Sequence, residues 1–450
     1  MMETTASRDA VRACLDAIER DDGRICSLIT VCGDEAMRQA EAADRAASNG
    51  RWLGLLHGMP VAIKDNIETA GVRTTSGSAF HADHVPNANA PVVDRLLRAG
   101  AVMVGKATLH EFAFGIRSDN TVSPQCRNPW NPKRVPGGSS GGSGAAVAAG
   151  FCVGALGSDT GGSVRLPAAI NGVTGLRPTH GRVPNTGSTP VSPSFDTIGP
   201  MARSVADTAR MFAVMAGHDP GDAWSEARSL ENFLPSLADG IDGIRIGVPR
   251  NFYFDDLHPD VARAIHAALG ELEGLGARLV EVSVPGAAET QKWATVMIFA
   301  DACAFHAKRL ETSPEMFSRE VYNRMTTGLS MTAVDYANAM RGREGWLRTL
   351  RTLFEEVDVL ASPAMPGLVP PIEDDRSLLD ATRDATRNTY AGALGRIPGL
   401  SVPCGFTGDG LPVGLQLEAA WWQEPLLFRV GHAYQGRTGW HRMHPPGPDA

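Results

Sequence analysis

Two segments rich in glycine and serine contain the residues best suited to chemistry. The first is VPGGSSGGSGAAVAAG, residues 135–150, and the second is GSDTGGSVRLPAAING, residues 157–172. In both, glycines lead into a helix-like run, and backbone amides at a helix start point outward and can bind a negative charge. A flexible linker would not lead into an apolar helix between two strands. The pattern therefore predicts two tight turns, each presenting serines.

Ser163 ends the glycine turn of the second segment and is a candidate nucleophile. The consecutive amides of Thr160, Gly161, Gly162 and Ser163 could stabilise an oxyanion while the Ser163 hydroxyl attacks a carbonyl. Taken alone, Ser163 is better explained as a helix N-cap. The nucleophile hypothesis therefore depends on other residues that could activate this serine.

Lys64 is the candidate base. It follows the apolar run MPVAI, residues 59–63, which is typical of a buried strand. Burial disfavours the ammonium form and lowers the pKa of a lysine, so a neutral amine could accept a proton near neutral pH. Taken alone, Lys64 is better explained as a strand-end lysine that extends to water or pairs with Asp65.

Taken together, these elements resemble the amidase signature family. The motifs GGSSGGSGAAVAAG and GSDTGGSVRLP match in order, and the spacing of Lys64, Ser139 and Ser163 is similar to that of the family. The resemblance covers about residues 50–220 and resumes weakly in VPCGFTGDGLPVGLQLEA and EPLLFRVGHAYQ. It implies that Ser163 is the nucleophile, Ser139 the bridging serine after a cis peptide bond, and Lys64 the base.

The resemblance also implies acyl transfer in two steps. Lys64 draws a proton from Ser163 through Ser139, an acyl-enzyme forms, and the same relay protonates the leaving amine and then activates water. Amides, carbamates (urethanes), ureas and esters all suit this chemistry. We therefore expect a small-molecule amide or carbamate substrate, no cofactor and no metal.

Four further residues are predicted to bind substrate: Ile116, Arg117, Ser140 and Arg165. The first two lie in a loop, residues 115–120, expected to influence substrate choice. Arg165 and Asp159 flank Ser163 and could support it or contact a substrate carboxylate. A structural ion pair between them is an equally good interpretation, and the sequence leaves the choice open.

A second scheme makes Ser139 the nucleophile. GGSSG, residues 137–141, also fits the G-x-S-x-G nucleophile elbow of α/β-hydrolases, an esterase-type arrangement with downstream acid and histidine partners. No histidine is marked for that role. The scheme also leaves GSDTGGS and Lys64 without a function, so we favour Ser163.

A third scheme lies within the same family, because the glutaminase subunit of a tRNA-dependent amidotransferase carries nearly the same two segments. It would require a protein partner. The run EFAFGIRSDNTVSPQCRNPW, residues 111–130, departs from the one expected of that subunit. A catalytically inactive scaffold is disfavoured because all three catalytic positions are present.

Two other patterns are set aside. GAVMVGKA, residues 100–107, is close to a P-loop, but Ala107 occupies the position where serine or threonine would hold magnesium. The pairs His81/His84 and His441/His444 have metal-like spacing but no third marked ligand. We expect these histidines to lie on the surface.

The surrounding elements predict an α/β fold. Helical spacing covers residues 7–20 and 34–48, with Ser7 and Asp34 as expected N-caps. Beyond residue 53, short apolar runs alternate with helices. The fold expected from the resemblance is the amidase signature fold, a mixed central β-sheet covered by helices on both faces.

We expect a single amidase domain over residues 1–450. Its predicted parts are a helical N-terminal segment, the signature core, a helix-rich cap or insertion that determines the substrate, and a return to the core. Their respective ranges are 1–50, 51–220, 221–370 and 371–450.

The composition excludes several classes of partner. A net charge of −8 and a pI near 5.9 disfavour binding to nucleic acid or to an anionic membrane. No apolar run is long enough to cross a membrane, and no secretion signal is evident. The seven cysteines show no disulfide or metal spacing. These features predict a cytoplasmic monomer or homodimer.

Overall fold

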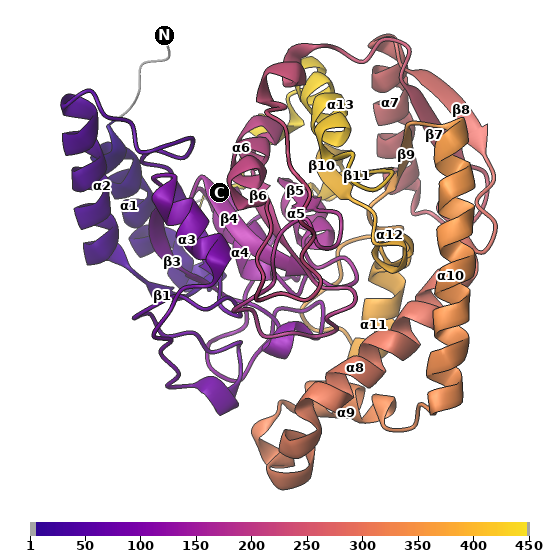
Figure 1. The fold of residues 1–450 in the computed structure, drawn as a ribbon, viewed down its shortest axis with the longest axis horizontal. Coiled ribbons are helices and arrows are strands. Elements are labelled where there is room, and N and C mark those ends of the chain that lie inside the picture. Colours follow the sequence, from indigo (N-terminus) through magenta and orange to yellow (C-terminus); the bar gives the residue numbers. More distant parts are fainter. Residues whose placement is uncertain (1–5, 448–450) are drawn as a thin grey trace.

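The fold is built around one mixed sheet in the computed structural model, which describes residues 6–447. The eleven strands follow the order β1-β3-β2-β4-β6-β5-β10-β11-β9-β7-β8 (Figure 1). The central pairs β2/β3 and β2/β4 are parallel, whereas β10 and β11 pair antiparallel. The strands are β1 Leu28–Val31, β2 Pro60–Lys64, β3 Val102–Ala107, β4 Gly154–Asp159, β5 Thr174–Arg177, β6 Thr197–Ala202, β7 Arg245–Pro249, β8 Arg278–Val282, β9 Val359–Pro363, β10 Gly399–Phe406 and β11 Pro412–Ala419.

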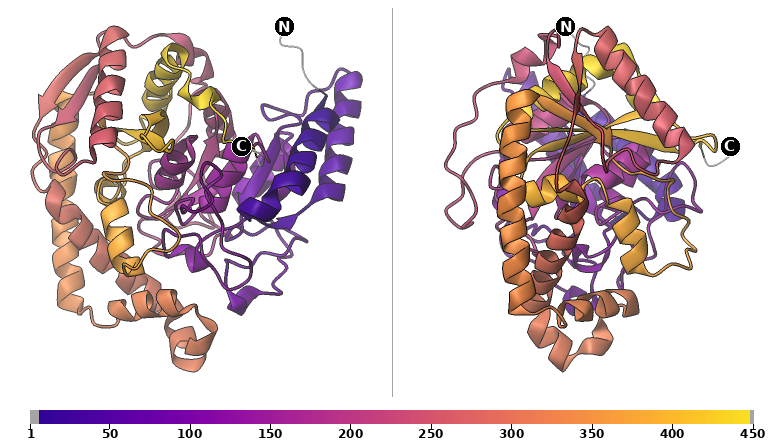
Figure 2. Two further views of the ribbon diagram at one scale, coloured as in Figure 1. Left: turned by 180° about the vertical axis from the view of Figure 1, so that it is seen from behind. Right: turned by 90° about the vertical axis from the view of Figure 1, so that its right-hand side faces the viewer.

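Helices cover both faces of this sheet, as predicted (Figure 2). One apolar core joins the sheet to α3, α6, α7 and α13, and a second joins it to α1, α2, α4 and α5. The helices are α1 Ser7–Ile25, α2 Gly33–Ser48, α3 Pro91–Arg98, α4 Gly141–Ala149, α5 Arg165–Asn171, α6 Val205–Met215, α7 Pro259–Gly274, α8 Thr290–Thr312, α9 Arg319–Gly328, α10 Ala333–Glu356, α11 Leu378–Ala385, α12 Tyr390–Gly395 and α13 Glu424–Arg437.

The first two helices begin without the predicted N-caps. The N-cap positions are Ala6 and Cys32, and neither side chain caps its helix. Ser7 is instead the first residue of α1. Its amide donates to the Asp44 carboxylate on α2 at 2.7 Å, so a neighbouring helix supplies the missing acceptor.

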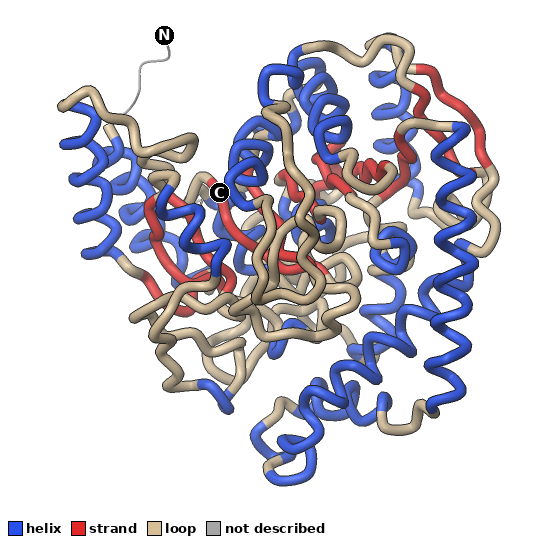
Figure 3. The backbone as a smooth tube through the Cα atoms, in the orientation of Figure 1, coloured by secondary structure: helices blue, strands red, loops and turns tan. Residues whose placement is uncertain are grey.

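The segment 221–370 contributes strands as well as helices. β7, β8 and β9 complete one end of the sheet, so the predicted helical cap corresponds only to α8, α9 and α10. These helices share a third apolar core with α12. Long loops, tan in Figure 3, gather between α3 and α8.

The part of the chain that the structure describes contains no helix long and apolar enough to cross a membrane. All seven cysteines are free thiols. The P-loop-like run forms β3, and the Lys106 amine is buried there against the carbonyl of Ile67 at 2.6 Å and the hydroxyl of Thr74 at 2.7 Å.

Candidate active site

The site lies where the parallel strands β2 and β4 end at the same edge of the sheet. Lys64 is the last residue of β2 and Asp159 is the last residue of β4. The predicted glycine turn follows Asp159 and leads into α5. Gly162 has a φ of +138°, and a Cβ at Gly161 would lie 2.7 Å from the Tyr390 ring. Only glycine fits these two positions without strain.

Lys64 and Ser139 are in direct contact. The Lys64 Nζ donates to Ser139 Oγ at 2.8 Å, and both side chains are fully buried. The peptide bond between Gly138 and Ser139 is cis. Burial lowers the pKa of Lys64 to about 7, although Asp159 and Asp196 act in the opposite direction. The amine can therefore be neutral near physiological pH.

Ser158 completes the surroundings of the amine and is absent from the predicted site. Its hydroxyl lies 2.8 Å from Lys64 Nζ and also accepts from Asn66 Nδ2 at 3.3 Å. Neutral hydroxyls can hydrogen-bond an amine without strongly favouring its charge. The signal in the sequence was its place in GSDTGGS, one residue before the end of β4.

Ser163 lies at the end of the glycine turn between β4 and α5. It is only partly buried and lines a small cavity of about 30 Å³. The N-cap of α5 is Val164, so the interpretation of Ser163 as an N-cap is wrong. Within residues 6–447 the Ser163 hydroxyl has no hydrogen-bond partner, which leaves it available to react.

The turn presents backbone amides, but not all those predicted. The Gly162 amide donates to Asp159 Oδ1 at 2.8 Å, so its predicted place in the oxyanion hole is taken by an internal contact. The amides of Thr160, Gly161 and Ser163 form no hydrogen bond within the described residues. These three remain the candidates for an oxyanion site.

Arg165 does not bind substrate in this arrangement, which corrects that prediction. Its guanidinium is fully buried and donates to Asp159 at 3.1 Å, to Gln416 at 3.1 Å and to Glu418 at 3.3 Å. Arg177 also pairs with Asp159 at 2.9 Å. These arginines hold the pKa of the Asp159 carboxyl well below its usual range. The ion pair that the sequence left as an alternative is the one observed.

Two more of the predicted substrate contacts point elsewhere. Ser140 is buried and its hydroxyl donates to the Ser158 carbonyl at 3.1 Å. Arg117 pairs with Glu320 at 2.6 Å and does not line the cavity. Ile116 does line it, beside Ser163, so the side chains of adjacent residues in this loop face opposite ways.

Asp196 connects the glycine turn to the loop that contains Val191 and Ser192. Its carboxylate accepts from Thr160 Oγ1 at 2.5 Å and from the amides of Val191 and Ser192 at 2.9 and 3.0 Å. Burial raises the pKa of Asp196 to about 6. Sequence reasoning missed this residue because it lies far from GSDTGGS in the chain.

The cavity beside Ser163 is mostly apolar. Its walls combine the loop 113–116, the glycine turn, α8 and helices near the C-terminal part of the chain. Among its lining residues, Arg324 is the one that carries a charge. The full lining is Ala113, Phe114, Gly115, Ile116, Thr160, Gly161, Ser163, Val191, Ile298, Arg324, Thr382, Thr386 and Tyr390.

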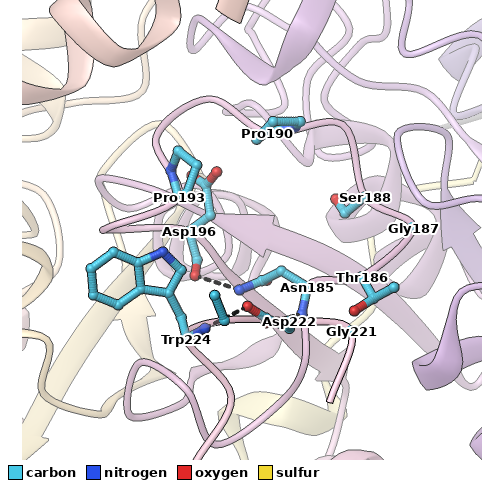
Figure 4. A pocket seen from close by; sticks show the side chains of 11 residues that line it. Asn185, Thr186, Gly187, Ser188, Pro190, Pro193, Asp196, Gly221, Asp222 and Trp224 are labelled. Carbon is cyan, nitrogen blue, oxygen red and sulfur yellow. Dashed lines mark hydrogen bonds between the residues drawn. The ribbon is translucent and has the colours of Figure 1, made fainter. Parts of the chain in front are cut away.

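A second pocket lies behind the turn but does not contain Ser163. Figure 4 shows Asn185 within it, donating to the Asp196 carbonyl at 2.9 Å, with Trp224 and Pro193 on one side. This pocket is larger, yet the side chains able to perform acyl transfer lie outside it. We therefore place the candidate active site at Ser163.

His81 and His84 have structural partners. His81 Nε2 lies 2.8 Å from Arg309 Nη2, and His84 lies 3.6 Å from Glu68. His441 and His444 are near the end of the described chain. Among residues 6–447, no group of three or more histidine, cysteine or acidic side chains could hold a metal ion.

Comparisons with known proteins show which proteins the whole chain is similar to. A family model described as Amidase matches residues 9–428. A Glutamyl-tRNA(Gln) amidotransferase subunit of Chloroflexus aurantiacus is 40% identical over 97% of this chain and 94% of that protein.

Solved structures are also similar. A chain from a vestigial protein complex that reveals the evolutionary origins of an s-triazine catabolic enzyme superposes with a TM-score of 0.91, at 34% identity and over 96% of both chains. The peptide amidase PAM, in complex with the competitive inhibitor chymostatin, gives a TM-score of 0.85 at 30% identity, over 98% of this chain and 96% of that one.

Proposed function

The chain belongs to the amidase family, and from this premise we propose that it hydrolyses linear amides through Ser163, Ser139 and Lys64. The observation that carries the proposal is the 2.8 Å contact between the Lys64 amine and Ser139 Oγ, next to the turn that presents Ser163. A buried amine with a pKa near 7 suits a base that must be neutral to act. Carbamates and activated esters fit the same chemistry.

Acylation begins when Ser163 Oγ attacks the amide carbon. Its proton passes to Ser139, whose own proton passes to the Lys64 amine. Free amides of the turn at Gly161 and Ser163 can stabilise the oxyanion. The C–N bond then breaks as the relay returns a proton to the leaving nitrogen. Water hydrolyses the acyl-enzyme by the same transfers, which restores all three residues.

Covalent labelling tests the assignment of the nucleophile. We expect a sulfonyl fluoride to modify Ser163 and no other serine. Ser163 is partly exposed, whereas Ser139 and Ser143 are buried. Peptide mapping by mass spectrometry locates the adduct. An adduct on Ser139 or Ser143 would instead support the nucleophile-elbow scheme.

Chelation tests the prediction that no metal takes part. We expect full amidase activity after prolonged dialysis against a chelator, because the proposed steps use only hydroxyls, an amine and backbone amides. Activity that is lost and then restored by zinc would contradict this expectation.

A second candidate function is that of the glutaminase subunit in a tRNA-dependent amidotransferase. It is favoured by the 40% identity to an amidotransferase subunit over nearly the whole chain. This function requires protein partners, whereas the first is compatible with a monomer or homodimer. Copurification with an endogenous partner protein, together with ammonia release from glutamine, would favour the second candidate.

A further inference from the structure

Arg324 is a buried cation without an acidic partner. It lies on α9 and is 6% exposed. Its Nη1 donates to Thr382 Oγ1 at 2.8 Å, while its Nε has no hydrogen-bond partner in the described part of the chain. The guanidinium packs over the rings of Phe114 and Phe299, at 4.5 and 5.1 Å.

An anion bound next to this guanidinium would offset the cost of its buried charge. Burial lowers the pKa of Arg324, yet an arginine keeps its charge in proteins. An unpaired buried charge is costly, and here no carboxylate lies within 4.0 Å among residues 6–447. The Arg324 Nε–H lacks a partner within the described residues, and a guanidinium can bind a planar carboxylate through two parallel hydrogen bonds.

The same cavity has no acidic partner for an ammonium group. No aspartate or glutamate is among the residues that line it. The nearby acids are engaged elsewhere: Glu320 pairs with Arg117 at 2.6 Å, and Asp196 holds Thr160 at 2.5 Å. An amino group bound beside Arg324 would meet a like charge and neutral hydroxyls, with no carboxylate to offset its charge.

We propose that the substrate of Ser163 is an amide that carries a carboxylate, bound by Arg324, and that bears no ammonium group. This inference rests on the proposed hydrolytic function and adds the substrate class. Arg324 also lines an outer pocket together with Arg319 and Glu320, and Arg117 pairs with the glutamate there. An anionic substrate entering from this pocket would pass Arg324 on its way to the cavity of Ser163.

Three amides with the same carbon chain test the proposal. They are 4-carbamoylbutanoate, which has the carboxylate alone; L-glutamine, which adds an ammonium; and pentanamide, which has neither. Two readouts use the purified full chain: kcat/KM for ammonia release, and protection of Ser163 from sulfonylation. We expect 4-carbamoylbutanoate to exceed both others by about 10- to 100-fold, the value of a charge-assisted hydrogen bond.

Arg324→Met should bring the ratio of kcat/KM for 4-carbamoylbutanoate to kcat/KM for pentanamide close to one. Arg341→Met is the matched control, because Arg341 is exposed on α10 and its loss should leave the ratio unchanged. Thermal unfolding checks that each variant is folded. If Arg324→Met does not fold, Arg324→Lys replaces it and should weaken the ratio, since lysine cannot bind a carboxylate through two parallel hydrogen bonds.

The outcomes separate this inference from the proposed function. A preference for glutamine would overturn the substrate class and support the amidotransferase candidate. Equal kcat/KM values for pentanamide and 4-carbamoylbutanoate would also overturn it. So would failure of 4-carbamoylbutanoate to protect Ser163 from sulfonylation. Failure of Ser163 to be labelled at all would instead contradict the proposed function itself.

Discussion

Ser163→Ala is expected to lower kcat for amide hydrolysis by about four to six orders of magnitude, as removal of a catalytic serine does elsewhere. Without Oγ no acyl-enzyme forms, and the remaining turn can only bind the substrate. The variant should still fold, because Ser163 makes no side-chain hydrogen bond in the described chain. Single-turnover assays with a chromogenic anilide, with mass detection of the acyl-enzyme, measure the effect.

Ser143→Ala is the matched control in the neighbouring segment. The Ser143 hydroxyl donates to the Leu156 carbonyl at 2.8 Å, a contact that belongs to the packing of α4 on β4. Its loss should change activity only a few-fold. Ser139→Ala should slow acylation while leaving Ser163 as the labelled residue. The triad would be abandoned if Ser163→Ala kept its activity and Ser139→Ala prevented labelling.

The elements around the site could be predicted because their patterns are local. MPVAI predicted a strand that places Lys64 at its end, and β2 ends at Lys64. The glycine turn was predicted from residue type, since the φ of Gly162 excludes other residues. The cis bond at Ser139 followed from the resemblance and not from any local signal.

The remaining features depend on contacts between distant segments. Nothing near Arg165 in the sequence indicates that Glu418 on β11 will pair with it. Arg324 reaches the cavity from α9, in a segment outside residues 50–220, where the resemblance was strongest. The strands β7, β8 and β9 join the same sheet through pairing between β9 and β11, which periodicity cannot predict.

The surroundings of the amine explain why a lysine can act here. Removal from water favours the neutral amine strongly, while Asp159 and Asp196 favour the charged form. Arg165 and Arg177 offset much of the Asp159 charge, because both pair with that carboxylate. Asp196, with a pKa of about 6, acts on Lys64 in the same direction as Asp159 and to a smaller extent.

Replacement of Lys64 is the second change for which we expect a large effect on activity. A pH profile of the wild type complements it. Lys64→Ala should lower amide turnover by about two to four orders of magnitude, the usual contribution of a general base. Activated esters should lose less, because their leaving groups need little protonation. Lys64→Arg should restore nothing, since a guanidinium does not give up its proton near neutral pH.

The pH dependence follows from the direction of the pKa shift. The working form of Lys64 is the neutral amine, and burial lowers its pKa from 10.5 to about 7. Amide kcat/KM in the wild type should thus rise with pH along one limb with a midpoint near 7, and stay high into the alkaline range. Asp196→Asn removes a charge that raises the pKa of Lys64, so this variant should move the midpoint to lower pH. A midpoint near that of an ordinary lysine, or retention by Lys64→Ala of more than about a tenth of the activity, would rule out Lys64 as the base.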